Sequence, residues 1–143
     1  MWPLLAFIAA LTLAALVWQV RTGDDSLTIA VSPAVKHIMF GFAASFAIHE
    51  TTHAMVLSRC PGVTHITIHR TAWRFSLTPL GTLTPLEAAA GAVAGPGVTV
   101  LVGAGLYLTG LDTTLALWYL CHLVFLLPFF GDGKTLITAL RHK

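Results

Sequence analysis

One stretch decides how this chain folds: residues 35–57, VKHIMFGFAASFAIHETTHAMVL, in which a long apolar run ends in a group of polar side chains. The stretch has the roughly 20 residues that an α-helix needs to cross the ~30 Å hydrocarbon layer of a bilayer. A charge at the centre of such a helix costs about 2.5–3.5 kcal/mol, yet His49, Glu50 and His53 fall within five positions. We expect a specific interaction to offset that cost.

The composition of the chain favours a membrane protein. Its 143 residues suffice for one domain. Of these, 56% are hydrophobic and 10% are charged, whereas a soluble domain carries about a quarter charged residues. A core of this size cannot hide so large an apolar excess, so we expect the lipid bilayer to be a partner. The formal net charge is only +2 and the basic residues are scattered, which argues against a nucleic-acid partner.

Three further apolar stretches have the length of a membrane span, at residues 2–20, 88–111 and 113–131. The first of them could instead be a cleaved signal peptide. It lacks a basic segment at its start, however, and we interpret it as a retained helix.

The pattern changes between the second and third apolar stretches. Cys60-Pro61-Gly62 predicts a turn, and residues 63–69 and 73–78 are β-prone runs that predict a hairpin. The predicted fold is therefore an all-α integral membrane protein with about four transmembrane helices and a small membrane-surface β-hairpin between the second and the third. Within the third helix, Gly95-Pro96-Gly97 should kink or loosen the backbone.

The basic residues predict the orientation of the chain. With four helices, both termini and the hairpin lie on the same side of the membrane. That side carries Arg59, Arg70, Arg74, Arg141 and Lys143. The positive-inside rule then places both termini in the cytoplasm, with His49 and Glu50 in the cytoplasmic half of their helix. We expect a multi-pass protein of the cell membrane, in a prokaryote.

The polar group of the second stretch has the spacing of a metal site. His49 and His53 are four residues apart, so a helix places both imidazoles on one face, one turn apart. Two zinc ligands need this spacing. Glu50 lies beside them, where it can act on water at the metal rather than bind the metal itself.

Asp132 is the best candidate for a third ligand, because a catalytic zinc usually has three protein ligands and one open position. It is one of four aspartates and ends the fourth apolar stretch. Pro128 should break the helix before it, and Gly131 and Gly133 allow the carboxylate to approach a metal closely. An ordinary carboxylate at the end of a helix is the alternative.

Other histidines leave alternatives open. His122 could be a ligand, a group that supports the ligands, or a hydrogen-bonded core residue, and we favour the last. His65 and His69 share one face of a predicted strand. A second metal site there is less favoured than a solvated strand face.

Taken in order, these features resemble the site-2 proteases, which are intramembrane zinc metalloproteases of the M50 type. His49-Glu50-Thr51-Thr52-His53 matches the HExxH of that family, and Asp132-Gly133 is similar to its Asp-Gly. A β-rich segment and a small-residue helix with Ala94-Gly95-Pro96 lie between them. The resemblance covers residues 36–143, so the chain divides into an additional first helix and loop at 1–33 and a three-helix core at 34–143.

The resemblance implies an enzyme that cleaves transmembrane segments of other proteins. It implies one Zn²⁺ per chain, held by His49, His53 and Asp132, with Glu50 as the general base. Gly95, Pro96, Pro128 and His122 are the candidates for substrate contact or for support of the ligands.

Two departures from the family pattern concern the substrate. Val124 stands where the family commonly has an Asn, and Pro128 lies four rather than five residues before Asp132. Neither removes a zinc ligand or the base. A non-catalytic membrane protein that binds or transports metal with the same fold is the alternative function, and the oligomeric state stays open.

Overall fold

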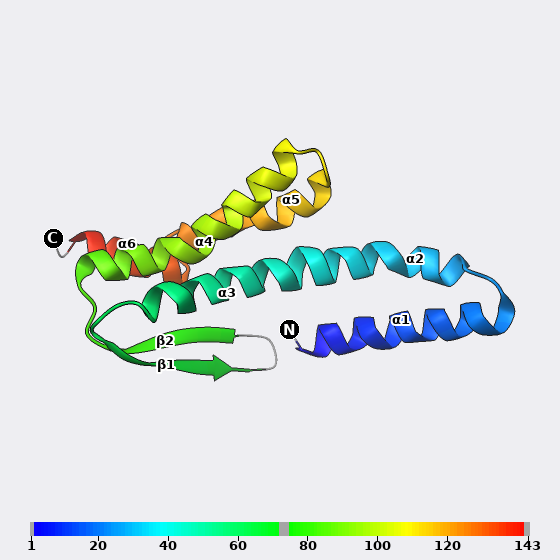
Figure 1. The fold of residues 1–143 in the computed structure, drawn as a ribbon, viewed down its shortest axis with the longest axis horizontal. Helices are drawn as coiled ribbons and strands as arrows, with labels where there is room; N and C mark the ends of the chain where they lie inside the picture. Colours follow the sequence, from blue (N-terminus) through cyan, green and yellow to red (C-terminus); the bar gives the residue numbers. More distant parts are fainter. Residues whose placement is uncertain (1, 72–74, 142–143) are drawn as a thin grey trace.

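The fold is seen in a computed structural model that describes residues 2–71 and 75–141. Helices predominate in it, and one two-stranded antiparallel sheet interrupts them. Figure 1 shows one long helix in the middle of the molecule, with other elements on both sides of it. Helix α1 (Trp2–Thr22) runs alongside this long helix, and the carboxyl-terminal helices pack against the other side of it.

The long helix spans Ser26–Leu57 in three consecutive parts. These are α2 (Ser26–Val35), the π-helical η1 (Lys36–Ala43) and α3 (Ala44–Leu57). The prediction of a loop up to residue 33 was therefore wrong. The helix begins earlier because the Asp24 carboxylate accepts a hydrogen bond from the Ser26 N–H at 2.9 Å, as a cap at a helix start does.

Pro33 lies inside this helix and would normally break it. A proline has no N–H, so the carbonyl of Ile29, four residues earlier, loses its usual donor. The Ser32 hydroxyl donates a hydrogen bond to that carbonyl at 3.1 Å instead. This substitute donor explains how the helix continues through a residue that sequence reasoning treats as a breaker.

The hairpin consists of β1 (Val63–Arg70) and β2 (Phe75–Gly81), paired antiparallel. The prediction of a hairpin is confirmed, although Trp73 and Arg74 of the second run lie outside the described residues. A bulge between Val63 and His65 interrupts the expected alternation there. His65 and His69 are both exposed, which agrees with a solvated strand face.

Helix α4 (Pro85–Leu108) starts at a capping box. The Thr84 hydroxyl accepts from the Glu87 N–H, and the Glu87 carboxylate accepts from the Thr84 N–H. The helix then continues through Gly95-Pro96-Gly97, where we expected it to kink or loosen. Gly95 and Pro96 are both buried, so packing from neighbouring helices on both sides holds this part of the chain in helical conformation.

The fourth apolar stretch is not one helix. It forms α5 (Thr113–Leu120), a 3₁₀ segment η2 (Cys121–Leu126), a break, and α6 (Gly131–Arg141). The two helical parts meet at an angle of 42°. The break has the predicted cause: Leu127, the residue before Pro128, is extended with ψ of 150°, because a proline disfavours the helical conformation of its predecessor.

Three helices of the described chain are long and apolar enough to cross a membrane: Trp2–Thr22, Ser26–Leu57 and Pro85–Leu108. The bent pair of α5–η2 with α6 adds a fourth if it counts as one span. Three or four apolar helices therefore agree with the prediction of about four.

Candidate metal centre

Helix α3 presents two imidazoles to the inside of the molecule. His49 and His53 are one turn apart and are only 3% and 8% exposed. Their Nε2 atoms lie 3.1 Å from each other. The predicted shared face of the helix is thus present, and it is the buried face.

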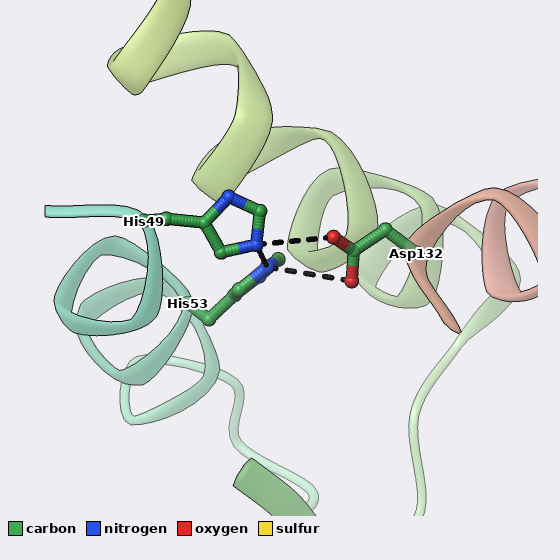
Figure 2. A group of neighbouring side chains, drawn as sticks. All are labelled: His49, His53 and Asp132. Carbon is green, nitrogen blue, oxygen red and sulfur yellow. Dashed lines mark hydrogen bonds and ion pairs between the residues drawn. The ribbon is translucent and has the colours of Figure 1, made fainter. Parts of the chain in front are cut away.

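Asp132 joins the two histidines from a distant part of the sequence. It lies in the first turn of α6, directly after the break at Pro128. Figure 2 shows its carboxylate facing both imidazoles: one oxygen is 3.2 Å from His49 Nε2 and the other is 3.4 Å from His53 Nε2. Within the described residues this is the only group of three or more His, Cys, Asp or Glu side chains that could hold a metal ion.

The spacing of these atoms fits a tetrahedral metal ion. Zinc binds imidazole nitrogen at about 2.0–2.1 Å and carboxylate oxygen at about 2.0–2.2 Å, so ligand atoms of a regular tetrahedron are ~3.3–3.5 Å apart. The three separations in this site are 3.1, 3.2 and 3.4 Å. Three lone-pair-bearing groups this close favour a cation between them, and two imidazoles with one carboxylate leave a fourth position open.

A backbone carbonyl of α4 orients His53. The Nδ1–H of His53 donates a hydrogen bond to the Gly91 carbonyl at 2.7 Å, which leaves the Nε2 lone pair directed at His49 and Asp132. Outer hydrogen bonds of this kind fix the tautomer and the ring plane of metal-binding histidines. Gly91 was not predicted as a site residue, because a carbonyl that a helix supplies has no sequence signature beyond the small residues of α4.

Two glycines allow the ligands to approach one another. A Cβ at Gly95 would collide with the imidazole ring of His53, and a Cβ at Gly133 would collide with the carbonyl of Leu127. Gly95 therefore lets α4 pack directly against the site. Gly133 lets α6 fold back onto the break, and this fold places Asp132.

A cavity of about 610 Å³ opens beside the three side chains. Glu50 is half-buried and lines this cavity together with His49, His53 and Asp132. Strand β2 also lines it, through residues 76–79. The cavity thus joins the candidate metal centre, a carboxylate on the same helix, and one strand of the hairpin.

The remaining predicted site residues lie further from the centre. His122 is 2% exposed and its ring lies 5.0 Å from that of His49, but it is not part of the group of ligand atoms. Within the described part of the chain its Nε2 has no hydrogen-bond partner, and the interpretation as a hydrogen-bonded core residue stays a prediction. Pro96 is buried in α4, and Pro128 is exposed; neither lines the cavity.

Phenylalanines that the sequence analysis did not single out surround the site. Phe46, Phe125, Phe129 and Phe130 all line the cavity. In an apolar chain, a phenylalanine near a site carries no signal that separates it from one facing lipid, so only the tertiary structure could identify these four.

Comparisons of this chain with protein-family models, curated proteins and solved structures find no match.

Proposed function

We propose that this chain is an intramembrane zinc metalloprotease of the site-2 protease type, which hydrolyses peptide bonds in or near the transmembrane segments of other proteins. The observation that carries the proposal is the convergence of His49, His53 and Asp132 at tetrahedral spacing. Glu50 lines the same cavity. Two His and one carboxylate, with a Glu directly after the first His, is the ligand set and base of zinc proteases.

The surface of the molecule supports a location in the bilayer. Large apolar side chains of α1 such as Trp2, Phe7, Leu13 and Val20 are 63–85% exposed. Water would disfavour a continuous apolar surface along a helix of 21 residues, whereas lipid would solvate it. The proposal includes a multi-pass location in the cell membrane of a prokaryote.

In the proposed reaction the metal ion would act as a Lewis acid, and Glu50 would transfer protons. A bound zinc ion supplies Lewis acidity, which polarises a peptide carbonyl and makes water a nucleophile near neutral pH. Glu50 takes the proton from the attacking water and later delivers it to the leaving amine, as a general base and then a general acid. His49, His53 and Asp132 would hold the zinc ion, and the phenylalanines that line the cavity would limit the access of bulk water to it.

Strand β2 supports a peptide as the substrate. A helix hides its own backbone, so a transmembrane substrate must unwind locally before cleavage. Within the described residues strand β2 pairs only with β1, and its residues 76–79 line the cavity. An unwound segment can therefore add to β2 as a further strand, which would bring its carbonyls toward the site.

Cleavage of a single-span substrate by purified protein in liposomes tests the proposal. We expect the wild type to cleave it and Glu50→Gln to cleave at least about 100-fold more slowly, because general acid–base catalysis contributes roughly 10²–10⁴-fold. Zinc content should be one ion per chain in both proteins.

Glu87→Gln is the matched control, because Glu87 is the other glutamate of the chain and a glutamine retains the capping box. It should cleave like the wild type. If Glu50→Gln cleaves at the wild-type rate, Glu50 is not the base. If the wild type binds zinc and cleaves no membrane substrate, the non-catalytic metal-binding or transport protein becomes the better description.

A further inference from the structure

The two histidines of the candidate centre are not supported equally. His53 has the Gly91 carbonyl as partner for its Nδ1 at 2.7 Å. The Nδ1 of His49 is buried and has no hydrogen-bond partner within the described residues. A metal-bound imidazole almost always donates its other N–H to an acceptor, which fixes the tautomer. The Nδ1 of His49 therefore still needs a hydrogen-bond acceptor that would fix the orientation of this ring.

The aromatic rings around His49 offer one such partner. Apart from His53, the rings in contact with it are Phe46, Phe125 and His122. The two phenylalanines have no hydrogen-bond acceptor. His122 has one, and its own Nε2 is the second buried nitrogen in the described chain without a partner.

The surroundings of His122 keep it directed toward the site. Its ring lies 4.9 Å from Phe46 and 5.2 Å from Phe125, and the whole residue is only 2% exposed. It belongs to the 3₁₀ segment Cys121–Leu126, which precedes the break that places Asp132. The tight turn of this segment brings a polar side chain into an otherwise apolar cluster.

We propose that His122 is a positioning residue for His49. Its Nε2 accepts the hydrogen bond of His49 Nδ1–H, either directly after a small ring rotation or through one buried water molecule. A single buried water commonly makes two to four hydrogen bonds, so in either arrangement both nitrogens gain a partner. The Nε2 lone pair of His49 is thereby held toward the metal. This inference rests on the proposed metal centre, but it does not require that the protein be a protease.

Metal binding by His122 variants tests the inference. His122→Phe keeps an aromatic ring within the cluster and removes both nitrogens, whereas His122→Gln keeps a polar atom at similar reach. Zinc affinity is measured by competition with a chromogenic chelator, and the ligand geometry by the visible spectrum of the Co²⁺-substituted protein. We expect His122→Phe to bind zinc about 10- to 100-fold more weakly, because the loss of a hydrogen-bond partner of a metal ligand typically has this effect. The Co²⁺ spectrum of His122→Phe should also differ from that of the wild type. His122→Gln should recover most of both.

His37→Phe is the matched control, because His37 contacts Trp118 rather than the site; it should bind zinc like the wild type. A folded His122→Phe protein with wild-type affinity and spectrum overturns the inference. So does a His122→Gln protein that binds zinc as weakly as His122→Phe, because a polar atom at this position then does not support the binding of the metal. A wild type that binds neither ion overturns this inference and the metal centre together. A wild type that binds zinc and cleaves nothing overturns only the protease.

Discussion

Gly95 and Gly133 show how single residues of this chain determine the site without contributing a functional group. A methyl group at either position would occupy the space of the His53 ring or of the Leu127 carbonyl. Gly95 and His53 are far apart in the sequence, and Gly133 and Leu127 lie on opposite sides of the break at Pro128. These glycines allow a close approach of backbone and ligand. The sequence pointed to Gly133 together with Gly131, and only the structure separates the two, because a Cβ at Gly131 would meet nothing within 4 Å.

Gly95→Ala should weaken metal binding. The added Cβ displaces the His53 imidazole, so we expect zinc affinity to fall by about 10- to 100-fold, the range typical of changes that reorient a ligand. Gly105→Ala is the control on the same helix, because its Cβ would meet nothing within 4 Å. It should leave zinc binding unchanged and raise stability slightly, since alanine favours a helix over glycine by roughly 0.5–1 kcal/mol. Equal zinc affinity in the two variants would contradict the role assigned to Gly95.

At the scale of elements, polar contacts join η1 to α5 and to Asp112 at the start of α5, and we call this contact region the η1–α5 seam. Lys36 forms an ion pair with Asp112 at 2.8 Å, and the Tyr119 hydroxyl donates to the Phe40 carbonyl at 2.7 Å. Trp118 packs where a Cβ at Gly41 would stand. The Tyr119 hydroxyl thus supplies a donor to the π-helical segment, in which the regular helical hydrogen bonds are interrupted. This seam fixes α5, and with it the segment that leads to His122 and Asp132.

The ion pair of this seam predicts a dependence of stability on pH. The hydrogen bond from Lys36, together with those from Thr114 and the Leu115 N–H, lowers the pKa of Asp112 below its ordinary value. A lowered pKa in the folded state means that the carboxylate stabilises the fold above its unfolded pKa of about 3.9, and that this contribution is lost as the pH falls through the folded pKa.

Thermal unfolding of Asp112→Asn in detergent checks this dependence. The variant should unfold at a lower temperature than the wild type at pH 7, and the difference should shrink as the pH falls below about 4. Asp25→Asn should follow the wild type over the whole range, because Asp25 makes no side-chain hydrogen bond at the start of α2. A difference between wild type and Asp112→Asn that is constant with pH would argue against the ion pair.

At the scale of the whole molecule, the two ends differ in their basic and acidic residues. Helix α6 ends at the side of the molecule where α3 passes into the hairpin and α4 begins, and the turn between α1 and α2 lies at the opposite end (Figure 1). Arg59 follows α3 and Arg141 ends α6 at the first end, whereas Arg70 ends β1, which runs from that end toward the middle of the molecule (Figure 1). Asp24 and Asp25 belong to the turn between α1 and α2 at the second end. Arg74 and Lys143, which also entered the prediction of orientation, lie outside the described residues. By the positive-inside rule we expect the first end to face the cytoplasm, and this orientation stays a prediction.

Cysteine labelling of intact cells tests this orientation. Single cysteines are introduced by Asp25→Cys and Arg141→Cys, both at exposed positions, after Cys60 and Cys121 have been replaced by serine. A membrane-impermeant maleimide should label the first variant in intact cells and the second only after permeabilisation. The reverse pattern would invert the topology and place the candidate metal centre nearer the outer face.

Much of the fold could be predicted because its causes are local. The β-prone runs after Cys60-Pro61-Gly62 predicted the hairpin, and Pro128 predicted the break before Asp132. The start of the second helix was missed because Asp24 and Ser32 satisfy backbone groups that a pattern of apolar residues does not reveal. The single apolar helix at residues 88–111 was also predicted, and α4 continues through Pro96, which is buried.

The sequence by itself determined the apolar helices, the hairpin and the shared face of His49 and His53, because spacing along a single element depends only on the geometry of that element. It also proposed Asp132 as a partner, and the role of these residues as metal ligands stays a prediction. Only the tertiary structure decided that Asp132 reaches both histidines, that Gly91 orients His53, and that His122 lies against His49. Those contacts join segments 38 to 83 residues apart, and how closely such segments approach is set by helix packing, which no local pattern encodes.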